Sequence, residues 1–238
     1  MTTKKTEKQE NLLINLLFNI MVPAVTLSKL GSYVPLEPHQ VLLIALAFPV
    51  SYAVYDFYKR KKLNAISVLG FVSILLTGVI GLLNLEKPTI WIAVKEATIP
   101  LAIGIFVLIS NKTKSPLVKT FVYSENFLDV PKIDAILEEK GKKPDLDKIL
   151  NLSSVFLAAS FFVSATLNFI LAMILIKSPT GTPEFNAELG KMIALSYPVI
   201  ALPSTLLIVG IVWYLFRSLK QLTGLTTEEL FAEKLREK

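Results

Sequence analysis

The sequence contains no cysteine and only one histidine, His39. Without thiols the chain forms no disulfide and offers no thiolate nucleophile, and one imidazole is too few for a zinc site built from His and Cys. The sequence patterns of zinc metalloproteases, glycine-rich nucleotide-binding loops and serine hydrolases are absent as well. We therefore expect no metal site, no cofactor and no enzymatic activity.

Charge is also scarce, since 18% of the 238 residues are charged while 53% are hydrophobic. Soluble domains carry about 25% charged residues. The charges that are present gather in short stretches between long apolar runs, and the mean hydropathy is +0.56. This pattern is typical of an integral membrane protein. The net charge of +6 fits loops held at an anionic membrane surface, and we expect no nucleic-acid partner.

Apolar stretches of membrane-spanning length recur along the sequence. A helix needs roughly 20 apolar residues to cross the hydrocarbon core of a bilayer. Six stretches meet this length, namely Leu12–Leu30, Val41–Tyr58, Ala65–Leu85, Ile90–Ser110, Leu152–Ile176 and Met192–Phe216. We therefore predict an all-α fold with a single polytopic transmembrane domain over residues 1–238, in which six helices form three helical hairpins.

Lysine and arginine favour alternate connections between these spans. About 20 of the 25 basic residues precede the first span, separate the second from the third or the fourth from the fifth, or follow the sixth, and such an excess marks cytoplasmic segments. The other three connections hold only Lys29, Lys87, Lys177 and Lys191. We predict a protein of the cell inner (plasma) membrane with a cytoplasmic N-terminus (1–11), loop (111–151) and tail (217–238).

The loop at 111–151 allows two interpretations. Apolar residues follow Pro131 and Pro144 at helical spacing, which predicts two short amphipathic helices at the inner membrane surface. The alternative is a solvated loop that only returns the chain to the membrane. In the tail, Thr226 followed three residues later by Glu229 predicts a capping box at the start of a short final helix.

Two segments of the sequence indicate an internal repeat. Ala45-Leu-Ala-Phe-Pro-Val50 resembles Ala194-Leu-Ser-Tyr-Pro-Val199, and an asparagine lies 30 residues before the proline in both, Asn19 before Pro49 and Asn168 before Pro198. The middle hairpin carries Pro100 but lacks the asparagine. Helices interrupted at these three prolines would resemble the repeats from which many transporters are built. Chance similarity among apolar segments is the alternative.

Polar side chains inside the spans mark a candidate intramembrane site. The asparagines Asn15, Asn19 and Asn168 and the adjacent charges Lys95 and Glu96 all lie in apolar stretches. Amide and ionisable groups in a membrane need partners, and ionisable groups there often serve a function. For the asparagines, close packing between helices is an equally good explanation.

The pair Lys95-Glu96 lies in the outer part of the fourth span. Adjacent residues on a helix point about 100° apart, so we expect the two side chains to find different partners. Asn84 and Glu86 on the neighbouring helix are within reach. A binding or proton-coupled site is one interpretation, and a pair that snorkels to the membrane edge is the other.

Several segments from the second to the sixth span resemble a known family. They are Trp91-Ile-Ala-Val-Lys95, Ile99-Pro-Leu-Ala-Ile-Gly104, Lys114-Ser-Pro-Leu-Val-Lys119 with Glu125 and Leu128, the helix with Gly78 and Gly81, and Leu167-Asn-Phe169. In these segments the chain is similar to bacterial intracellular septation protein A. Residues 181–186 and 194–203 resemble a related group of uncharacterised inner-membrane proteins, some of them loosely labelled transporters.

The resemblance implies an inner-membrane protein connected with cell-envelope synthesis or septation. Our first hypothesis is a non-enzymatic protein that lies in the lipid bilayer and contacts other envelope membrane proteins, or itself as a homo-oligomer. A small-solute transporter or channel, with a site between helices broken at proline, is the alternative. One water-accessible cavity lined by the polar residues of the spans would favour transport. The chain departs from the family in its outer loop at Ser178–Glu188 and in its longer charged cytoplasmic loop.

Overall fold

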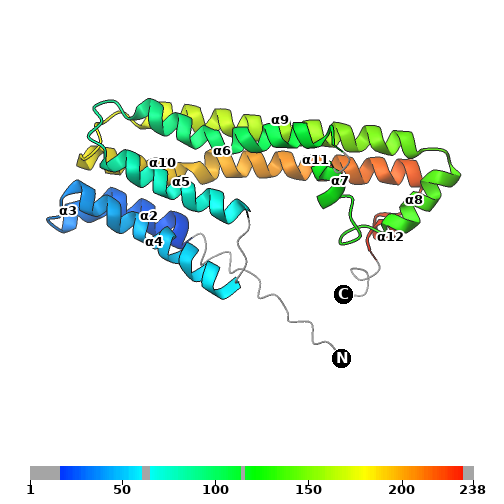
Figure 1. Cartoon of the computed structure of the whole chain (residues 1–238), viewed down its shortest axis with the longest axis horizontal. Helices are drawn as coiled ribbons and strands as arrows, with labels where there is room; N and C mark the ends of the chain where they lie inside the picture. The colour runs from blue at the N-terminus through cyan, green and yellow to red at the C-terminus, as the bar shows by residue number, and fades with distance from the viewer. Residues whose placement is uncertain (1–16, 61–64, 114–115, 233–238) are drawn as a thin grey trace. The chain divides into compact units, whose positions relative to one another are not determined.

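Helices make up the fold throughout the described part of the chain. The computed structural model describes residues 17–60, 65–113 and 116–232 (Figure 1). Within these ranges the chain forms helices and one isolated bridge between Leu128 and Phe231, and no strand. The predicted all-α class is confirmed. Asn15 lies outside the described residues.

Four helical stretches are long and apolar enough to cross a membrane. They are Pro38–Tyr55, Thr89–Ser110, Lys143–Leu175 and Pro183–Thr223, and an 18-residue segment of each has a mean hydropathy between 1.3 and 2.2. A fifth apolar stretch, Val68–Leu82, is shorter. In an 18-residue segment of each stretch, between 11% and 28% of the residues are buried inside the chain. Helices that are apolar and yet largely exposed are suited to lipid surroundings.

The first predicted span is helical but is not a regular α-helix. The helical path runs through η1 (Leu17–Met21), α2 (Val22–Val25), η2 (Thr26–Leu30) and α3 (Gly31–Tyr33), and both η segments are π-helical. Pro23 lies in the first turn of α2, directly after η1. A proline ring clashes with the carbonyl four residues earlier in an α-helix, so a wider turn before Pro23 accommodates it.

The next three helices occupy the second, third and fourth predicted spans. They are α4 (Pro38–Arg60), α5 (Ala65–Leu82) and α6 (Thr89–Ser110). Pro49 lies inside α4 and Pro100 inside α6, and both helices continue past the proline. The interruption expected at these two positions therefore does not occur. Apolar helices tolerate proline when neighbouring groups satisfy the freed carbonyl.

The last helices are longer than the sequence indicated. The predicted amphipathic helix after Pro144 and the fifth predicted span form one helix, α9 (Lys143–Leu175), because neither proline nor glycine separates them. The sixth predicted span lies within a helical path made of α10 (Pro183–Ser196), η3 (Tyr197–Ala201) and α11 (Leu202–Thr223). The π-helical η3 contains Pro198.

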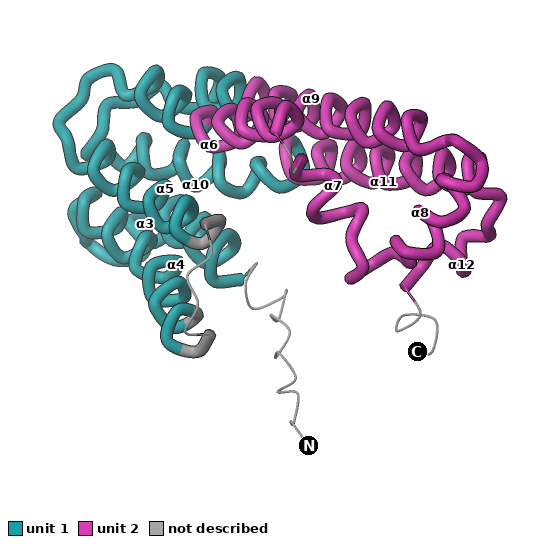
Figure 2. The backbone as a smooth tube through the Cα atoms, turned by 45° about the vertical axis from the view of Figure 1, so that its right-hand side comes forward, with its two compact units in different colours: residues 1–96, 168–199 teal, residues 97–167, 200–238 magenta. Residues whose placement is uncertain are grey.

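The expected single domain consists of two compact units (Figure 2). Unit 1 contains residues 1–96 and 168–199, and unit 2 contains residues 97–167 and 200–238. In unit 1, α4 packs against α5, and α10 packs against α2, η2 and α4. The most deeply buried residues of unit 1 include Leu27, Leu42, Ala45, Phe185 and Leu189.

Unit 2 contains a folded body that we call the cap. The cap consists of α7 (Leu117–Phe121), α8 (Val130–Glu139), α12 (Thr227–Leu230) and the segments that join them to the ends of α9 and α11. Its hydrophobic core contains Val118, Tyr123, Leu128, Ile133, Leu137, Leu146, Leu150, Leu215, Leu219 and Leu230. Ile133 and Leu137 are 0% exposed. The apolar face of α8, expected at the membrane surface, therefore packs inside the protein.

Candidate functional site

The charged pair of the fourth predicted span belongs to a polar cluster between α5 and α6 in unit 1. Lys95 Nζ lies 2.6 Å from Glu96 Oε1. The same ammonium donates hydrogen bonds to Thr77 Oγ1 at 2.7 Å and to Ser73 Oγ at 3.4 Å. The expectation that Lys95 and Glu96 would turn to different partners is wrong.

The direct pairing follows from the length of the lysine side chain. The Cβ atoms of adjacent residues diverge on a helix, but a stem of four flexible carbons brings the ammonium back to its neighbour. Asn84 and Glu86, the candidate partners within reach, are exposed residues of the connection after α5. The partners on α5 are instead Ser73 and Thr77, one helical turn apart.

The Lys95 ammonium is satisfied within this cluster. A lysine has three N–H donors, and Glu96, Thr77 and Ser73 supply an acceptor for each. Thr77 also donates to the backbone carbonyl of Ser73 at 3.0 Å, which fixes its hydroxyl. The side chain of Lys95 is 6% exposed, whereas that of Glu96 is 24% exposed. The cluster therefore buries its cation and leaves its carboxylate partly accessible.

The other predicted site residues of unit 1 lie on different helices. Asn19 lies in η1 and Asn168 in α9; both are partly buried, and each has an interaction partner. Asn19 is in a π-helical turn and Asn168 in an α-helix, whereas Pro49 is in an α-helix and Pro198 in a π-helical turn. The two matched halves of the proposed repeat therefore differ in local conformation at these positions.

Two connections of unit 1 are joined by hydrogen bonds. The N–H of Thr180 donates to the carbonyl of Leu85 at 3.0 Å, and its hydroxyl accepts from the N–H of Leu85 at 2.8 Å. The hydroxyl of Thr89 donates to the carbonyl of Ile176 at 2.7 Å. These bonds attach the α5–α6 connection to the α9–α10 connection.

The beginning of α10 extends this attachment. Asn186 Nδ2 donates to the carbonyl of Pro38 at 2.7 Å. The Glu188 carboxylate accepts from the N–H groups of Lys177 and Ser178 at 2.8 and 2.9 Å and from the Ser178 hydroxyl at 2.8 Å. We call the α3–α4, α5–α6 and α9–α10 connections with the start of α10 the loop junction.

In unit 2, backbone hydrogen bonds join the loop to the tail. The N–H of Asp129 donates to the carbonyl of Leu230 at 2.9 Å, and the N–H of Ala232 donates to the carbonyl of Phe127 at 3.0 Å. These bonds flank the isolated bridge. Lys140 Nζ donates to the carbonyl of Thr223, the last residue of α11, at 2.6 Å. The cap is therefore closed by contacts between segments far apart in the sequence.

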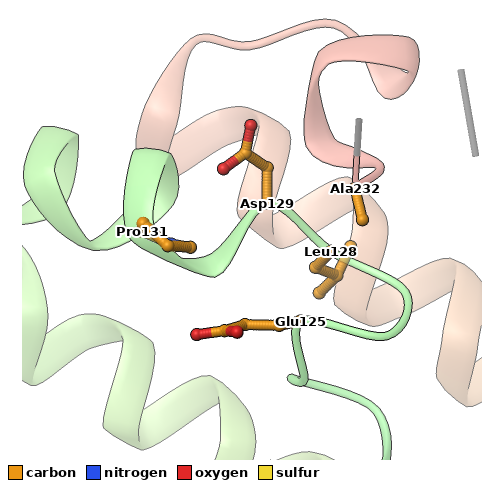
Figure 3. Close-up of a pocket in the computed structure, with 5 residues that line it drawn as sticks. All are labelled: Glu125, Leu128, Asp129, Pro131 and Ala232. Atoms are coloured by element: carbon orange, nitrogen blue, oxygen red, sulfur yellow. The ribbon is translucent and has the colours of Figure 1, made fainter. Parts of the chain in front are cut away.

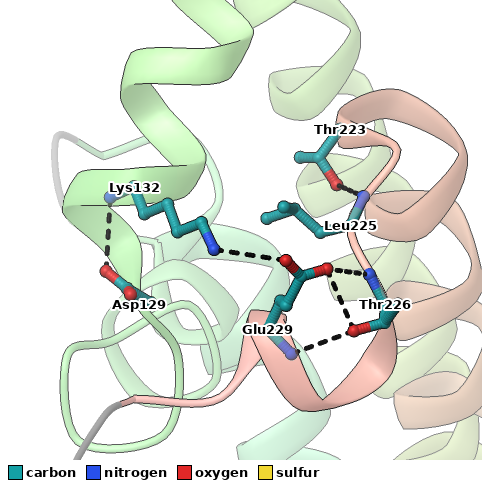
Figure 4. A network of polar contacts seen from close by, with 6 residues as sticks. All are labelled: Asp129, Lys132, Thr223, Leu225, Thr226 and Glu229. Atoms are coloured by element: carbon teal, nitrogen blue, oxygen red, sulfur yellow. Dashed lines mark hydrogen bonds and ion pairs between the residues drawn. The ribbon is translucent and has the colours of Figure 1, made fainter.

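The predicted capping box at the start of α12 is confirmed (Figure 4). Glu229 Oε2 accepts from the N–H of Thr226 at 2.8 Å, and the Thr226 hydroxyl accepts from the N–H of Glu229 at 3.3 Å. Lys132 of α8 lies 3.6 Å from Glu229 Oε1. The backbone hydrogen bond from Thr226, its hydroxyl and the nearby Lys132 lower the pKa of the Glu229 carboxyl.

A buried tyrosine holds the loop of the cap. Tyr123 donates a hydrogen bond of 2.8 Å to Asp134 Oδ1 of α8, and its side chain lies in the cap core. Burial, and then the hydrogen bond to Asp134, raise the pKa of Tyr123 well above its ordinary value. The phenol therefore stays protonated and acts as a structural donor.

An open hollow of about 150 Å³ lies on the cap, lined by Glu125, Leu128, Asp129, Pro131 and Ala232 (Figure 3). The carboxylates of Glu125 and Asp129 point in different directions. Asp129 also accepts a hydrogen bond from the N–H of Lys132 as the N-cap of α8. Among the described residues no group of His, Cys, Asp and Glu is arranged to hold a metal ion. The lining of the hollow therefore does not form a metal site.

Comparison with protein families, with curated proteins and with solved structures finds no match to this chain. The candidate site is therefore defined by the contacts within this molecule alone. Sequence reasoning missed both the loop junction and the partners inside the cap. One signal was available, because Thr182 followed by Pro183 is typical of a helix start, and Thr182 is the N-cap of α10.

Proposed function

We propose that this chain is a six-span protein of the inner membrane that acts through contacts of its cap with other envelope membrane proteins, without catalysing a reaction. The cap carries this proposal, because the loop and the tail fold around one hydrophobic core to which the ends of α9 and α11 also contribute. A body of this kind presents a defined surface to a partner. The resemblance of the sequence to bacterial intracellular septation protein A favours a partner in the cell envelope.

The loop junction supports the six-span topology. It collects the three connections that hold few basic residues, and these connections alternate along the chain with the lysine-rich ones. Alternation of this kind follows if the helical path 17–33 and α5 cross the membrane together with the four longer stretches. The cap and residues 59–62 then lie on the cytoplasmic side, in agreement with the distribution of lysine and arginine.

The absence of cysteine makes this topology directly testable. Glu86→Cys places one thiol in the loop junction, and Glu139→Cys places one on the cap, both at exposed positions. With a maleimide that does not cross membranes, we expect Glu86→Cys to react in intact cells and Glu139→Cys to react only after permeabilisation. The reverse pattern would invert the orientation, and equal labelling of both would contradict the six-span arrangement.

The contact function is tested by photo-crosslinking from the cap. A photoreactive amino acid at Glu139 should give discrete crosslinks to membrane proteins, whereas the same group at the exposed Val209 of α11 should label mainly lipid. We expect a deletion strain to show envelope stress. Leu230→Asp, which removes a fully buried side chain from the cap core, should abolish the crosslinks and cause the same stress. Crosslinks that persist after the cap is opened would contradict the proposal.

A second candidate function is a small-solute transporter or channel. The buried charge at Lys95 favours it, because ionisable groups within membrane spans often mark functional sites. Lys95→Met should then remove activity in a protein that still folds, while Leu230→Asp should leave it. If the protein instead acts through contacts of its cap, Leu230→Asp should cause the envelope phenotype and Lys95→Met should not. The two variants therefore separate the candidates.

A further inference from the structure

Two aromatic side chains of the loop of unit 2 are left exposed by the residues that the structure describes. Phe121 is 65% exposed and Phe127 is 55% exposed. Between them, Tyr123 turns inward to the cap core, as does Val118 one turn before Phe121. In this segment Val118 and Tyr123 are therefore buried in the protein, whereas the two phenylalanines face outward.

The segment is held beside the end of a long apolar helix. The hydroxyl of Ser110, the last residue of α6, accepts a hydrogen bond of 3.3 Å from the N–H of Leu117, the first residue of α7. The next residue, Asn111, donates a side-chain hydrogen bond to Asn151 of α9. Polar residues thus mark the level at which both helices leave their apolar stretches, and α7 starts at this level.

The charge of the segment differs from that of the rest of the loop. Residues 111–127 contain three lysines and one acidic residue, Glu125, while the other acidic residues of the loop lie between 129 and 147. Lys112 and Lys119 are exposed. Lys119 lies 3.9 Å from Asp147, with both side chains at least half exposed, so this contact neutralises it little.

We infer that Phe121 and Phe127 insert into the boundary between headgroups and acyl chains of the bilayer, where Lys112 and Lys119 meet anionic headgroups. Exposed aromatic residues with flanking lysines at the end of a span are the composition of an interfacial anchor, and basic residues near the surface are attracted to anionic lipid. The inference rests on the proposed membrane crossing of α6. It assigns the loop a lipid contact separate from the partner surface of the cap.

Tryptophan fluorescence tests this inference on the full chain in liposomes with brominated acyl chains. The chain has two tryptophans, Trp91 and Trp213, and both are exposed on apolar helices. A variant with Trp91→Phe alone reports from Trp213 and checks that the chain is in the bilayer. Adding Trp213→Phe and Phe121→Trp, or Phe127→Trp, reports from the proposed anchor. Glu139→Trp in the same background is the control. It lies just before α9, which runs about 12 Å before it reaches Asn151, so position 139 is far from the level at which the apolar stretch begins.

We expect bromolipid to quench Trp213 and the tryptophans at 121 and 127, and to leave the tryptophan at 139 unquenched. The quenching at 121 should increase when phosphatidylglycerol replaces phosphatidylcholine, and Lys112→Gln with Lys119→Gln should remove that increase. Quenching of Trp213 without quenching at 121 and 127 would overturn the anchor and leave the spans intact. Loss of quenching at Trp213 would overturn the membrane crossing itself.

A protein partner gives a different result. If a tryptophan at 121 is shielded from acrylamide in native membranes but accessible to it in liposomes of pure lipid, a protein covers this surface and the lipid anchor is refuted. Shielding in both preparations supports the anchor.

Discussion

Gly190 of α10 lies against the backbone carbonyl of Ala24 of α2. A Cβ atom at Gly190 would be 2.7 Å from that oxygen and 2.5 Å from Ser28 Oγ. The carbonyl cannot withdraw without distorting α2. We therefore predict that Gly190→Ala destabilises the protein by about 1–3 kcal/mol, the usual penalty of overpacking, measured as a lower unfolding temperature in detergent.

The same helical path supplies the control for this substitution. Apart from its chain neighbours and the nearby backbone of its own helix, no atom of the described residues lies within 4 Å of the position that a Cβ of Gly210 would take. Because alanine favours helix over glycine by roughly 0.5–1 kcal/mol, Gly210→Ala should leave the unfolding temperature unchanged or raise it. Equal losses at 190 and 210 would show that the close approach of α10 to α2 is not what requires glycine.

Removal of the buried lysine should destabilise unit 1. Lys95→Met leaves the Glu96 carboxylate without its cation and the hydroxyls of Ser73 and Thr77 without their donor. We expect a loss of about 1–3 kcal/mol, the range for an unsatisfied buried polar group. Lys95→Met with Glu96→Gln should recover part of it, because the uncompensated charge is gone.

Lys191→Met is the matched control, since Lys191 is an exposed lysine of α10. It should change stability by less than the Lys95 variant when both are unfolded in mixed detergent micelles. A double variant at 95 and 96 that is less stable than Lys95→Met alone would contradict the role of the ion pair.

Loss of the N-cap should release α12 from the cap. Thr226→Ala removes the hydroxyl that accepts from the N–H of Glu229, and N-cap substitutions of this kind cost about 1 kcal/mol. Hydrogen exchange of the 225–232 segment should accelerate about fivefold, the ratio for that energy. The exposed Thr227 lies outside the capping box, so Thr227→Ala should leave the exchange rate unchanged.

The docking of α12 against the rest of the cap should weaken at acidic pH. The pKa of Glu229 is lowered from its ordinary value of 4.5 by the hydrogen bonds from Thr226 and by Lys132. A lowered pKa in the folded state means that the contacts stabilise docking above the ordinary pKa and lose this effect as the pH falls through the folded value. Docking should therefore weaken below about pH 4.5.

Spin labels at Glu139→Cys and Thr227→Cys, in a chain that otherwise lacks thiols, measure this docking as a distance distribution. The distribution should broaden on acidification, and Glu229→Gln should remove the step caused by this group. A step that persists unchanged in Glu229→Gln belongs to another carboxyl group.

The sequence was sufficient for the helices because their signal is local. Apolar length marks each long helix, and the capping box at Thr226 uses residues three positions apart. The sequence hides the continuity of α9 through Asn151 because the unbroken apolar run begins only at Leu152, although nothing between Pro144 and Leu152 ends a helix. Proline is well tolerated in the first turn of a helix, and Pro144 occupies the second position of α9.

The cap and the polar cluster could not be read from the sequence to the same degree. The apolar side of α8 is visible as a pattern, but its partner is the tail, which is distant along the chain. For Lys95, the expected separation from Glu96 follows from the directions of the Cα–Cβ bonds, whereas the observed pairing depends on the reach of the lysine side chain. The π-helical turns have no clear sequence signal, since Pro49 and Pro198 sit in similar hexapeptides and adopt different helices.

The bridge between Leu128 and Phe231 also fixes an order of events during synthesis. Leu128, Ile133 and Leu137 leave the ribosome long before the residues that cover them in α11 and α12. Until α11 and Leu230 have been synthesised, the apolar side of α8 lacks the residues of the tail that cover it. Nascent chains halted after α9 should therefore bind chaperones through this segment, and release should coincide with the emergence of residues 224–232.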